Sequence, residues 1–254
     1  MSAKYEVTGN GLKILAIITM VIDHIGAGLI EVWLKMNWDS YPNQDFPYLL
    51  YHVDLVLRYI GRIAFPLYCY LLVEGFFHTK NIRKYAVRLL TIAIISEVPF
   101  DYLIANKFFY PEYNNVLWEL LLGLITLYAY SYINNKVHNI GIRYALWFVV
   151  LVTAIALAHY AELDYHEAGI CCISVMYFSY GPSRANRLSS LATGILMLVL
   201  LSGSMEIVAL VTLIPMYFYQ GRRGVNNRVI KTMFYLVYPV HIIVLGMIAY
   251  FFLR

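Results

Sequence analysis

The chain has 254 residues, of which 61% are hydrophobic and 13% charged, and its mean hydropathy is +0.64. A soluble domain carries roughly 25% charged residues, so this composition excludes a soluble globular protein and indicates a polytopic membrane protein. The few polar residues leave no room for a soluble domain, and no Pro/Ser-rich linker divides the sequence. We therefore expect one all-α transmembrane domain over residues 1–254.

Apolar runs separated by polar or Gly/Pro-containing breaks predict about nine membrane-spanning helices. In chain order the runs cover residues 12–34, 53–77, 82–104, 115–133, 142–160, 166–180, 187–202, 205–219 and 229–253. The sixth, seventh and eighth runs are short, so eight or ten spans are also compatible with the sequence. The first run is longer than a signal-peptide core and lacks a small-residue cleavage site, so we expect it to remain as a span.

The distribution of Lys and Arg predicts the orientation, because short cytoplasmic loops carry an excess of these residues. On the nine-span model one side holds 14 of them and the other side only Lys35, Lys107 and Arg254. We therefore place the N-terminus in the cytoplasm and the C-terminus outside, in the inner membrane. The formal charge of +4 is then an orientation signal and a possible contact with anionic lipid, with no case for nucleic acid.

The first apolar run contains an acid and a histidine, Asp23 and His24, near its midpoint. A charged side chain at the centre of the bilayer costs about 2.5–3.5 kcal/mol on insertion scales, so such residues usually face the protein interior and mark a functional site. Counting along the other runs places Arg62, Glu97 and His241 at a similar depth. We interpret these five residues as one shared cavity, in preference to independent polar contacts between helices.

The second run also carries Arg58, one helical turn before Arg62, and a buried guanidinium needs an anion. Asp23, Glu97 or a bound substrate are the candidates. A histidine beside a carboxylate is typical of a general base. Adjacent helical residues point about 100° apart, so Asp23 could pair with Arg62 and leave His24 to work with Glu97 or His241.

Familiar soluble-enzyme motifs are absent from the sequence: there is no G-x-S-x-G elbow, H-E-x-x-H helix or P-loop. Three cysteines in apolar runs, two of them adjacent, favour packing over disulfides or a metal site, and we expect no metal. The basic stretches 80–84 and 221–224 are candidates for binding phosphates, although basic loops also follow from topology alone.

Taken together, short sequence words resemble the TraX family, membrane proteins typified by the acetyltransferase that modifies the N-terminus of conjugative pilin. The resemblance covers nearly the whole chain. It rests on Lys13-Ile14 and 20–24, on 61–67 with Glu74-Gly75-Phe76, on Lys84-Tyr85 with Arg88, on 95–101, on Asp164-Tyr165 with Gly169, on Arg222-Arg223-Gly224, and on Phe234-Tyr235 with 238–241. His166-Glu167 departs from the smaller residues expected there.

The resemblance implies transfer of an acetyl group from cytoplasmic acetyl-CoA to a pilin, another peptide N-terminus or an envelope glycan. It assigns catalysis to His24 and His241 as candidate bases, with Asp23 and Glu97 tuning the base and Arg62 holding the thioester or its oxyanion. Donor binding falls to Arg222, Arg223, Lys84, Glu74 and Tyr238, and acceptor binding to Arg58, Asp101 and Asp164.

Two other functions remain open from the sequence. A proton-coupled transporter or flippase could use the same buried acids and histidines as a proton relay, although we find no internal repeat. A pilus-assembly partner without catalysis is the third alternative, and it would leave the charged central layer without a role.

Overall fold

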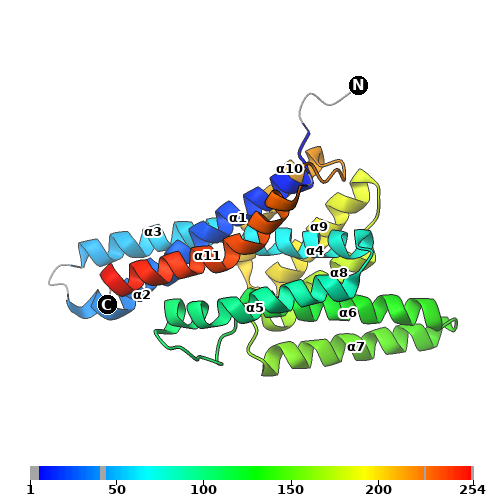
Figure 1. Ribbon diagram of the computed structural model, residues 1–254, viewed down its shortest axis with the longest axis horizontal. Helices are drawn as coiled ribbons and strands as arrows, with labels where there is room; N and C mark the ends of the chain where they lie inside the picture. Colours follow the sequence, from blue (N-terminus) through cyan, green and yellow to red (C-terminus); the bar gives the residue numbers. More distant parts are fainter. Residues whose placement is uncertain (1–5, 41–43, 226, 253–254) are drawn as a thin grey trace.

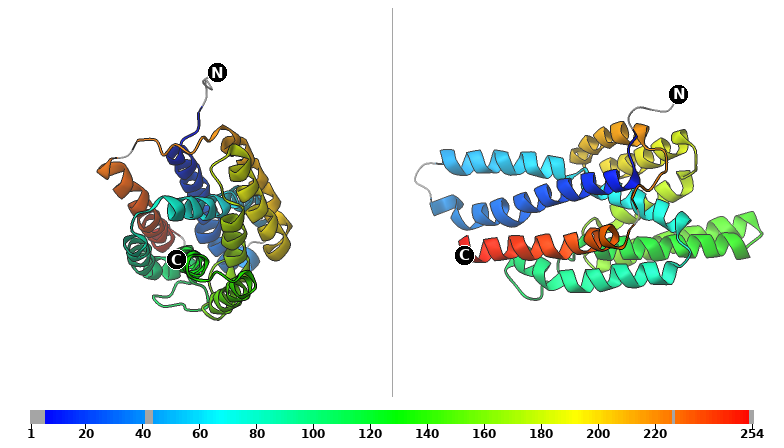
Figure 2. Two further views of the ribbon diagram at one scale, coloured as in Figure 1. Left: turned by 90° about the vertical axis from the view of Figure 1, so that its right-hand side faces the viewer. Right: turned by 45° about the horizontal axis from the view of Figure 1, so that its top comes forward.

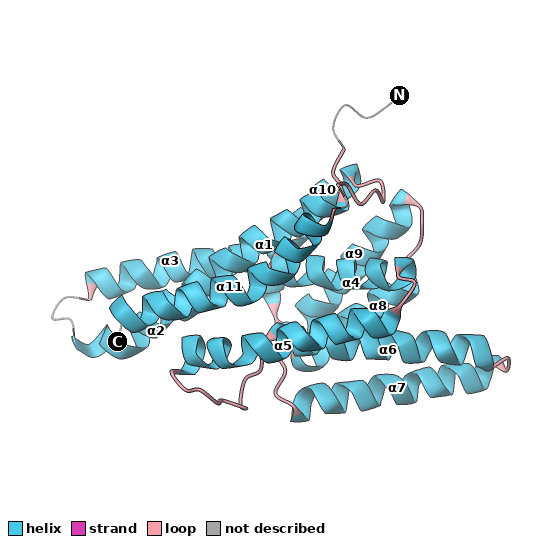
Figure 3. Cartoon of the chain, in the orientation of Figure 1, coloured by secondary structure: helices cyan, strands magenta, loops and turns pink. Residues whose placement is uncertain are grey.

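The computed structural model describes residues 6–40, 44–225 and 227–252. Every named secondary-structure element in this part of the chain is a helix, and loops join the helices (Figure 3). Lys4 and Arg254 of the charge count, and Leu253 at the end of the ninth predicted span, lie outside the described residues. The helical elements are α1 (Gly9–Ile25), the π-helical turn η1 (Gly26–Ile30), α2 (Glu31–Asn37), η2 (Trp38–Ser40), α3 (Asp45–Gly61), α4 (Ala64–His78), α5 (Ile82–Ala105), α6 (Val116–Lys136), α7 (Ile140–Tyr160), α8 (His166–Ser179), α9 (Arg184–Ser202), η3 (Ser204–Thr212), α10 (Leu213–Phe218) and α11 (Arg228–Phe252).

Polar residues directly before the first helical residue explain where several helices begin. A side-chain oxygen that accepts from an amide of the first turn satisfies a donor that would otherwise lack a partner. The N-cap residues that accept in this way are Thr8 for α1, Asn81 for α5, Asn115 for α6, Asn139 for α7 and Ser183 for α9. These caps fix the ends of helices whose apolar sequence alone gives no sharp boundary.

The helical membrane fold predicted from composition is confirmed. Within the described residues, six helical segments are long and apolar enough to cross a membrane: Gly9–Ser40, Asp45–His78, Val116–Lys136, Ile140–Tyr160, Arg184–Ser202 and Val229–Phe252. Helix α5, the shorter helix α8 and the apolar segment Ser204–Phe218 are not among the six. The figure of nine spans therefore stays a prediction.

The helices lie side by side: α1 and α2 run in one direction, and α3 and α4 run back in the other (Figures 1 and 2). The turns α4–α5, α6–α7 and α8–α9 lie at the end where α1 begins. Helices α1, α3 and α11 extend toward the opposite end, and α7 covers the outside of α6 and α8. Residues from α1, α4, α5, α6, α8, α9 and α11 share one apolar core.

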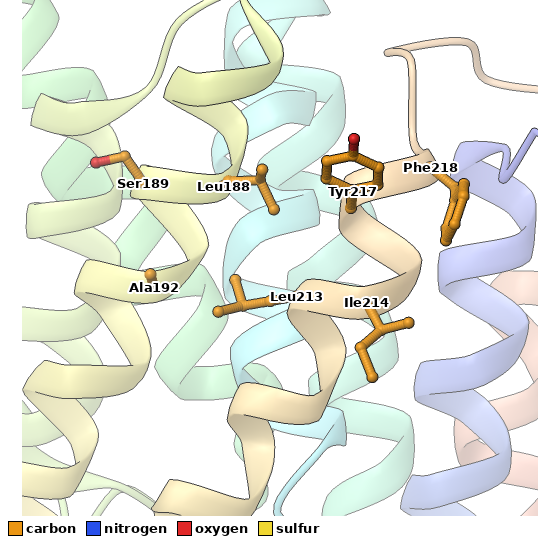
Figure 4. Close-up of a pocket in the computed structure, with 7 residues that line it drawn as sticks. All are labelled: Leu188, Ser189, Ala192, Leu213, Ile214, Tyr217 and Phe218. Atoms are coloured by element: carbon orange, nitrogen blue, oxygen red, sulfur yellow. The ribbon is translucent and has the colours of Figure 1, made fainter. Parts of the chain in front are cut away.

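A shallow apolar groove of about 580 Å³ runs along the outside of the bundle between α9 and α10 (Figure 4). Its lining residues are Leu188, Ser189, Ala192, Leu213, Ile214, Tyr217 and Phe218. None of these residues is an acid, a base or a histidine, so the surface of the groove is apolar.

Candidate functional site

An ion-pair network joins α1 to α3. The Asp23 carboxylate accepts from Arg58 Nη1 at 2.6 Å and from Arg62 Nη2 at 3.5 Å. Arg58 lies in the last turn of α3 and Arg62 follows directly after the helix, one turn further on, so both reach the same acid. A methyl group on Gly61 would lie closer than 3.0 Å to three atoms of Asp23, so the absent side chain is what lets α1 and α3 approach.

Arg62 has further partners from two other segments. Its Nη1 donates to Glu206 at 3.2 Å and lies 3.4 Å from the Tyr165 hydroxyl. The Tyr165 ring stacks on Phe65 at 3.7 Å between centroids, which holds the turn before α8 against α4. The Arg62 guanidinium therefore connects α1, α3, η3 and the α7–α8 turn.

Asp164 extends the polar network on the same side. The Tyr113 hydroxyl donates to its carboxylate, and this bond joins the α5–α6 loop to the α7–α8 turn. Burial raises the pKa of Asp164 above its ordinary value, while the bond from Tyr113 and the charge of Arg62 oppose the change. Arg58 and Asp164, two of the residues predicted to bind the acceptor, therefore lie in the same polar layer as Asp23 and Arg62.

The two histidines at membrane depth meet each other. Their ring centroids are 5.0 Å apart, and His241 Nε2 lies 3.4 Å from His24 Nδ1. His24 Nδ1 is 2.8 Å from the Met20 carbonyl oxygen, and His241 Nδ1 is 2.8 Å from that of Val237. A carbonyl oxygen only accepts, so Nδ1 of each ring carries a hydrogen and Nε2 of each neutral ring carries a lone pair.

Other predicted residues lie away from this centre. Glu97 accepts from Trp118 Nε1 at 2.5 Å and from the Asn115 amide, so it ties α5 to the start of α6. Asp101 accepts from the Tyr110 backbone amide at 2.9 Å and holds the α5–α6 loop. The structure thus brings together Asp23, Arg58 and Arg62, and separately His24 and His241, while Glu97 contacts neither group.

A cavity of about 600 Å³ lies between α1, α4, α5 and α11, within the roughly 300–1,000 Å³ typical of small-molecule sites. Basic side chains line the part where α1, α5 and α11 begin: Lys13, Lys80, Lys84, Arg88, Arg223 and Lys231. The opposite end is lined by Met20, Val116, Leu117 and Tyr238. Met20 precedes His24 by one helical turn, and the Tyr238 ring is 6.1 Å from that of His24 and 5.3 Å from that of His241.

Four of the five residues predicted to bind the donor line this cavity, and whether they bind it stays a prediction. Lys84, Arg223, Glu74 and Tyr238 line it. Arg222 instead pairs with Glu6 at 3.2 Å on the exposed surface. The Glu74 carboxylate accepts from the Tyr219 hydroxyl at 2.7 Å and from Tyr70 at 3.4 Å, so the acid is held in the cavity wall.

Sequence reasoning missed three members of the polar network: Glu206, Tyr165 and Tyr113. Glu206 had a usable signal, because it is an acid inside the apolar run 205–219. Tyr165 lies in the word Asp164-Tyr165 that carries the family resemblance, but this word gave it no role. Tyr113 had no signal, since 24 tyrosines are scattered along the chain.

Comparison with known proteins decides the family. The TraX protein family model matches residues 8–249. The chain belongs to the TraX family. This confirms the resemblance seen in the sequence, and the cavity, the histidine pair and the arginine network all lie inside the matched range.

Relatives of this TraX-family protein include the probable fimbrial assembly protein FimC, serogroup H1, of Dichelobacter nodosus. It is 29% identical over 264 residues, which cover 96% of this chain and 97% of the relative. The uncharacterized protein RP591 of Rickettsia prowazekii (strain Madrid E) is 22% identical over 182 residues, covering 66% of this chain and 61% of the relative. No solved structure matches the chain.

Proposed function

We propose that this TraX-family protein is a membrane-embedded acetyltransferase that moves an acetyl group from cytoplasmic acetyl-CoA to an acceptor at a midplane site. The observation that carries the proposal is the cavity that leads from a basic opening to the residues beside His24 and His241. A donor with a phosphorylated nucleotide at one end and a reactive thioester at the other fits a site with this polarity.

In this proposal the basic end binds the phosphates of CoA. Lys84 and Arg223 line that end, on α5 and on the loop before α11. Lysine and arginine form charge-assisted hydrogen bonds with phosphate oxygens, so the cluster fits a polyanion. The aliphatic wall formed by Leu71, Leu89 and Ile92 suits the uncharged arm that links the nucleotide to the thioester.

We assign the general base to His24. In the described part of the chain, Nε2 of His241 faces His24 Nδ1, whereas Nε2 of His24 has no hydrogen-bond partner. Protonation at His24 Nε2 would leave its Nδ1–H donating toward Met20 and His241, which stabilises the imidazolium. His241 acts as the positioning residue.

The reaction proceeds by acyl transfer without an external oxidant or reductant. A lone pair of the acceptor nitrogen or oxygen forms a bond to the acetyl carbonyl carbon, and His24 Nε2 takes the proton that this atom loses. The carbon–sulfur bond then breaks, the electron pair leaves with the CoA sulfur, and the proton held by His24 passes to that thiolate. The products are the acetylated acceptor and CoA.

The proposed topology has nine spans, with the N-terminus in the cytoplasm and the C-terminus outside, in the inner membrane. It is supported by the turns α4–α5, α6–α7 and α8–α9, which lie at the same end as the start of α1 and the basic end of the cavity. The acceptor would then approach from the side of the Asp23 network. The name of the fimbrial assembly relative is consistent with a pilin, and another peptide N-terminus or an envelope glycan are the other acceptor classes.

The test is transfer of labelled acetyl from acetyl-CoA to a peptide with a free N-terminus, using purified protein in lipid nanodiscs. We expect transfer by the wild type and a loss of about 10²–10⁴-fold in kcat for His24→Ala. Full activity in His24→Ala would overturn the base assignment, and full activity in His241→Ala would overturn the positioning role of His241. A proton-coupled transporter would not be stabilised by CoA, whereas this proposal requires CoA to raise the melting temperature of the wild type.

A further inference from the structure

The oxygen of the acetyl group needs a partner that Arg62 does not supply. Arg62 is committed to Asp23, Glu206 and Tyr165, and it does not line the cavity. In acyl transfer the carbonyl oxygen gains negative charge, and preorganised donors aimed at it are usually the largest single contribution to catalysis.

The Tyr238 hydroxyl is a donor placed at the inner end of the cavity. Tyr238 is 6% exposed, and no described residue accepts a hydrogen bond from its hydroxyl. A buried tyrosine hydroxyl normally finds such a partner, and leaving it unpaired costs about 1–3 kcal/mol. The ring also stands nearly perpendicular to that of His24, at 87°, so one residue contacts both the cavity and the base.

A second donor lies next to this hydroxyl, at the N-terminus of α6. Val116 is the first residue of this 21-residue helix and lines the same end of the cavity, where its backbone amide faces the Tyr238 hydroxyl. The first amides of a helix have no partner within the helix and carry the positive end of its dipole. Asn115 caps the next amide, that of Leu117, at 3.0 Å and leaves the Val116 amide available to an anion.

Resting on the proposed acetyl transfer, we infer that the Tyr238 hydroxyl and the Val116 amide form the oxyanion hole for the thioester carbonyl. When the acceptor attacks, the carbonyl π electrons move onto oxygen, and this oxygen accepts hydrogen bonds from the two donors. These electrons form the carbonyl double bond again when the carbon–sulfur bond breaks. Glu97 acts as a positioning residue, since its bonds to Asn115 and Trp118 hold the start of α6 in place.

The test is Tyr238→Phe, which removes one oxygen and keeps the ring. We expect kcat to fall about 10²-fold, the magnitude seen when one oxyanion donor is removed, with the KM for acetyl-CoA within about twofold of the wild type. The matched control is Tyr250→Phe on the same helix, an exposed tyrosine away from the cavity, which should keep wild-type kcat.

Infrared spectroscopy of bound acetyl-CoA labelled with ¹³C at the carbonyl gives a readout that a structural role would not change. The wild type should shift the carbonyl stretch to lower frequency, and Tyr238→Phe should lose most of that shift while still binding CoA. Wild-type kcat and an unchanged stretch in Tyr238→Phe would overturn the inference and leave the acetyltransferase proposal intact. A wild type that transfers no acetyl from acetyl-CoA would overturn both.

Discussion

Gly61→Ala tests whether the contact between α1 and α3 sets the geometry of the ion-pair network. The new methyl group would approach the Cβ, Cγ and Oδ1 atoms of Asp23 to less than 3.0 Å, a distance that real Cβ contacts do not show. Asp23 is a short side chain, so it can only yield by moving away from Arg58, whose Nη1 lies 2.6 Å from its carboxylate.

The expected loss in the free energy of unfolding follows from the Asp23–Arg58 ion pair that this movement breaks. Loss of a buried ion pair costs about 3–5 kcal/mol, and the lower end applies because the side chains of Asp23 and Arg58 are 19% and 25% exposed. Alanine is the better helix former by up to about 1 kcal/mol, so the net loss of stability is about 2 kcal/mol. For a chain of this size that lowers the melting temperature by about 4–8 °C.

The assay is thermal unfolding of purified protein in detergent, with Gly246→Ala as the matched control. Gly246 also lies within a long helix, but the nearest atom to its added methyl group is 3.9 Å away, so this control should melt no lower than the wild type. In an Asp23→Gly background, the same Gly61→Ala change should lose most of its effect. An equal loss in both backgrounds would refute a clash with Asp23.

Three further predictions concern the cavity and the loops. Lys84→Ala and Arg223→Ala should each raise the KM for acetyl-CoA several-fold with little change in kcat, and the effect should shrink at high salt, where charge contacts are screened; Lys136→Ala, an exposed basic residue at the same end, is the control. A double-mutant cycle of Tyr113→Phe and Asp164→Asn, followed by chemical or thermal unfolding, should give a coupling energy of about 1.5–3 kcal/mol, and a value near zero would contradict the bond between the two loops. Glu97→Gln should lower kcat more than the affinity for CoA, because it weakens the anchor of α6 without touching the basic end; equal losses in both would point to general misfolding.

The sequence predicted the helices and the depth of their polar residues better than it predicted which side chains meet. Depth follows from counting residues, so Asp23, Arg62 and His241 could be placed at one level. Rotation about the helix axis decides contacts, and an apolar run in a membrane gives little information on which face points inward. Asp23 was correctly expected to meet Arg62, whereas the same reasoning offered Glu97 as a partner and the structure supplies Glu206.

The cavity lined by Lys84 and Arg223 shows a second limit of the sequence. Lys84 and Arg223 were candidates because they lie in basic loops, and so was Arg222, which differs from its neighbour only in pointing the other way. No sequence pattern tells which of two adjacent arginines in one loop lines the cavity. The conformation of the loop decides it. The backbone amides of Gly9 and Asn10 donate to the carbonyl oxygens of Arg222 and Arg223, and these bonds fix the loop against the start of α1.

Arg58 and Arg62 both have carboxylate partners, and this explains how the bundle can hold these charges close to His24. Arg58 and Arg62 face Asp23 and Glu206, so each of these four charged groups has a partner of opposite charge that offsets its desolvation. His24 belongs to the same helix as Asp23 but makes its bonds to Met20 and His241. A histidine that needs no carboxylate partner stays neutral at membrane depth, and a neutral imidazole with a free Nε2 is the form that can accept a proton.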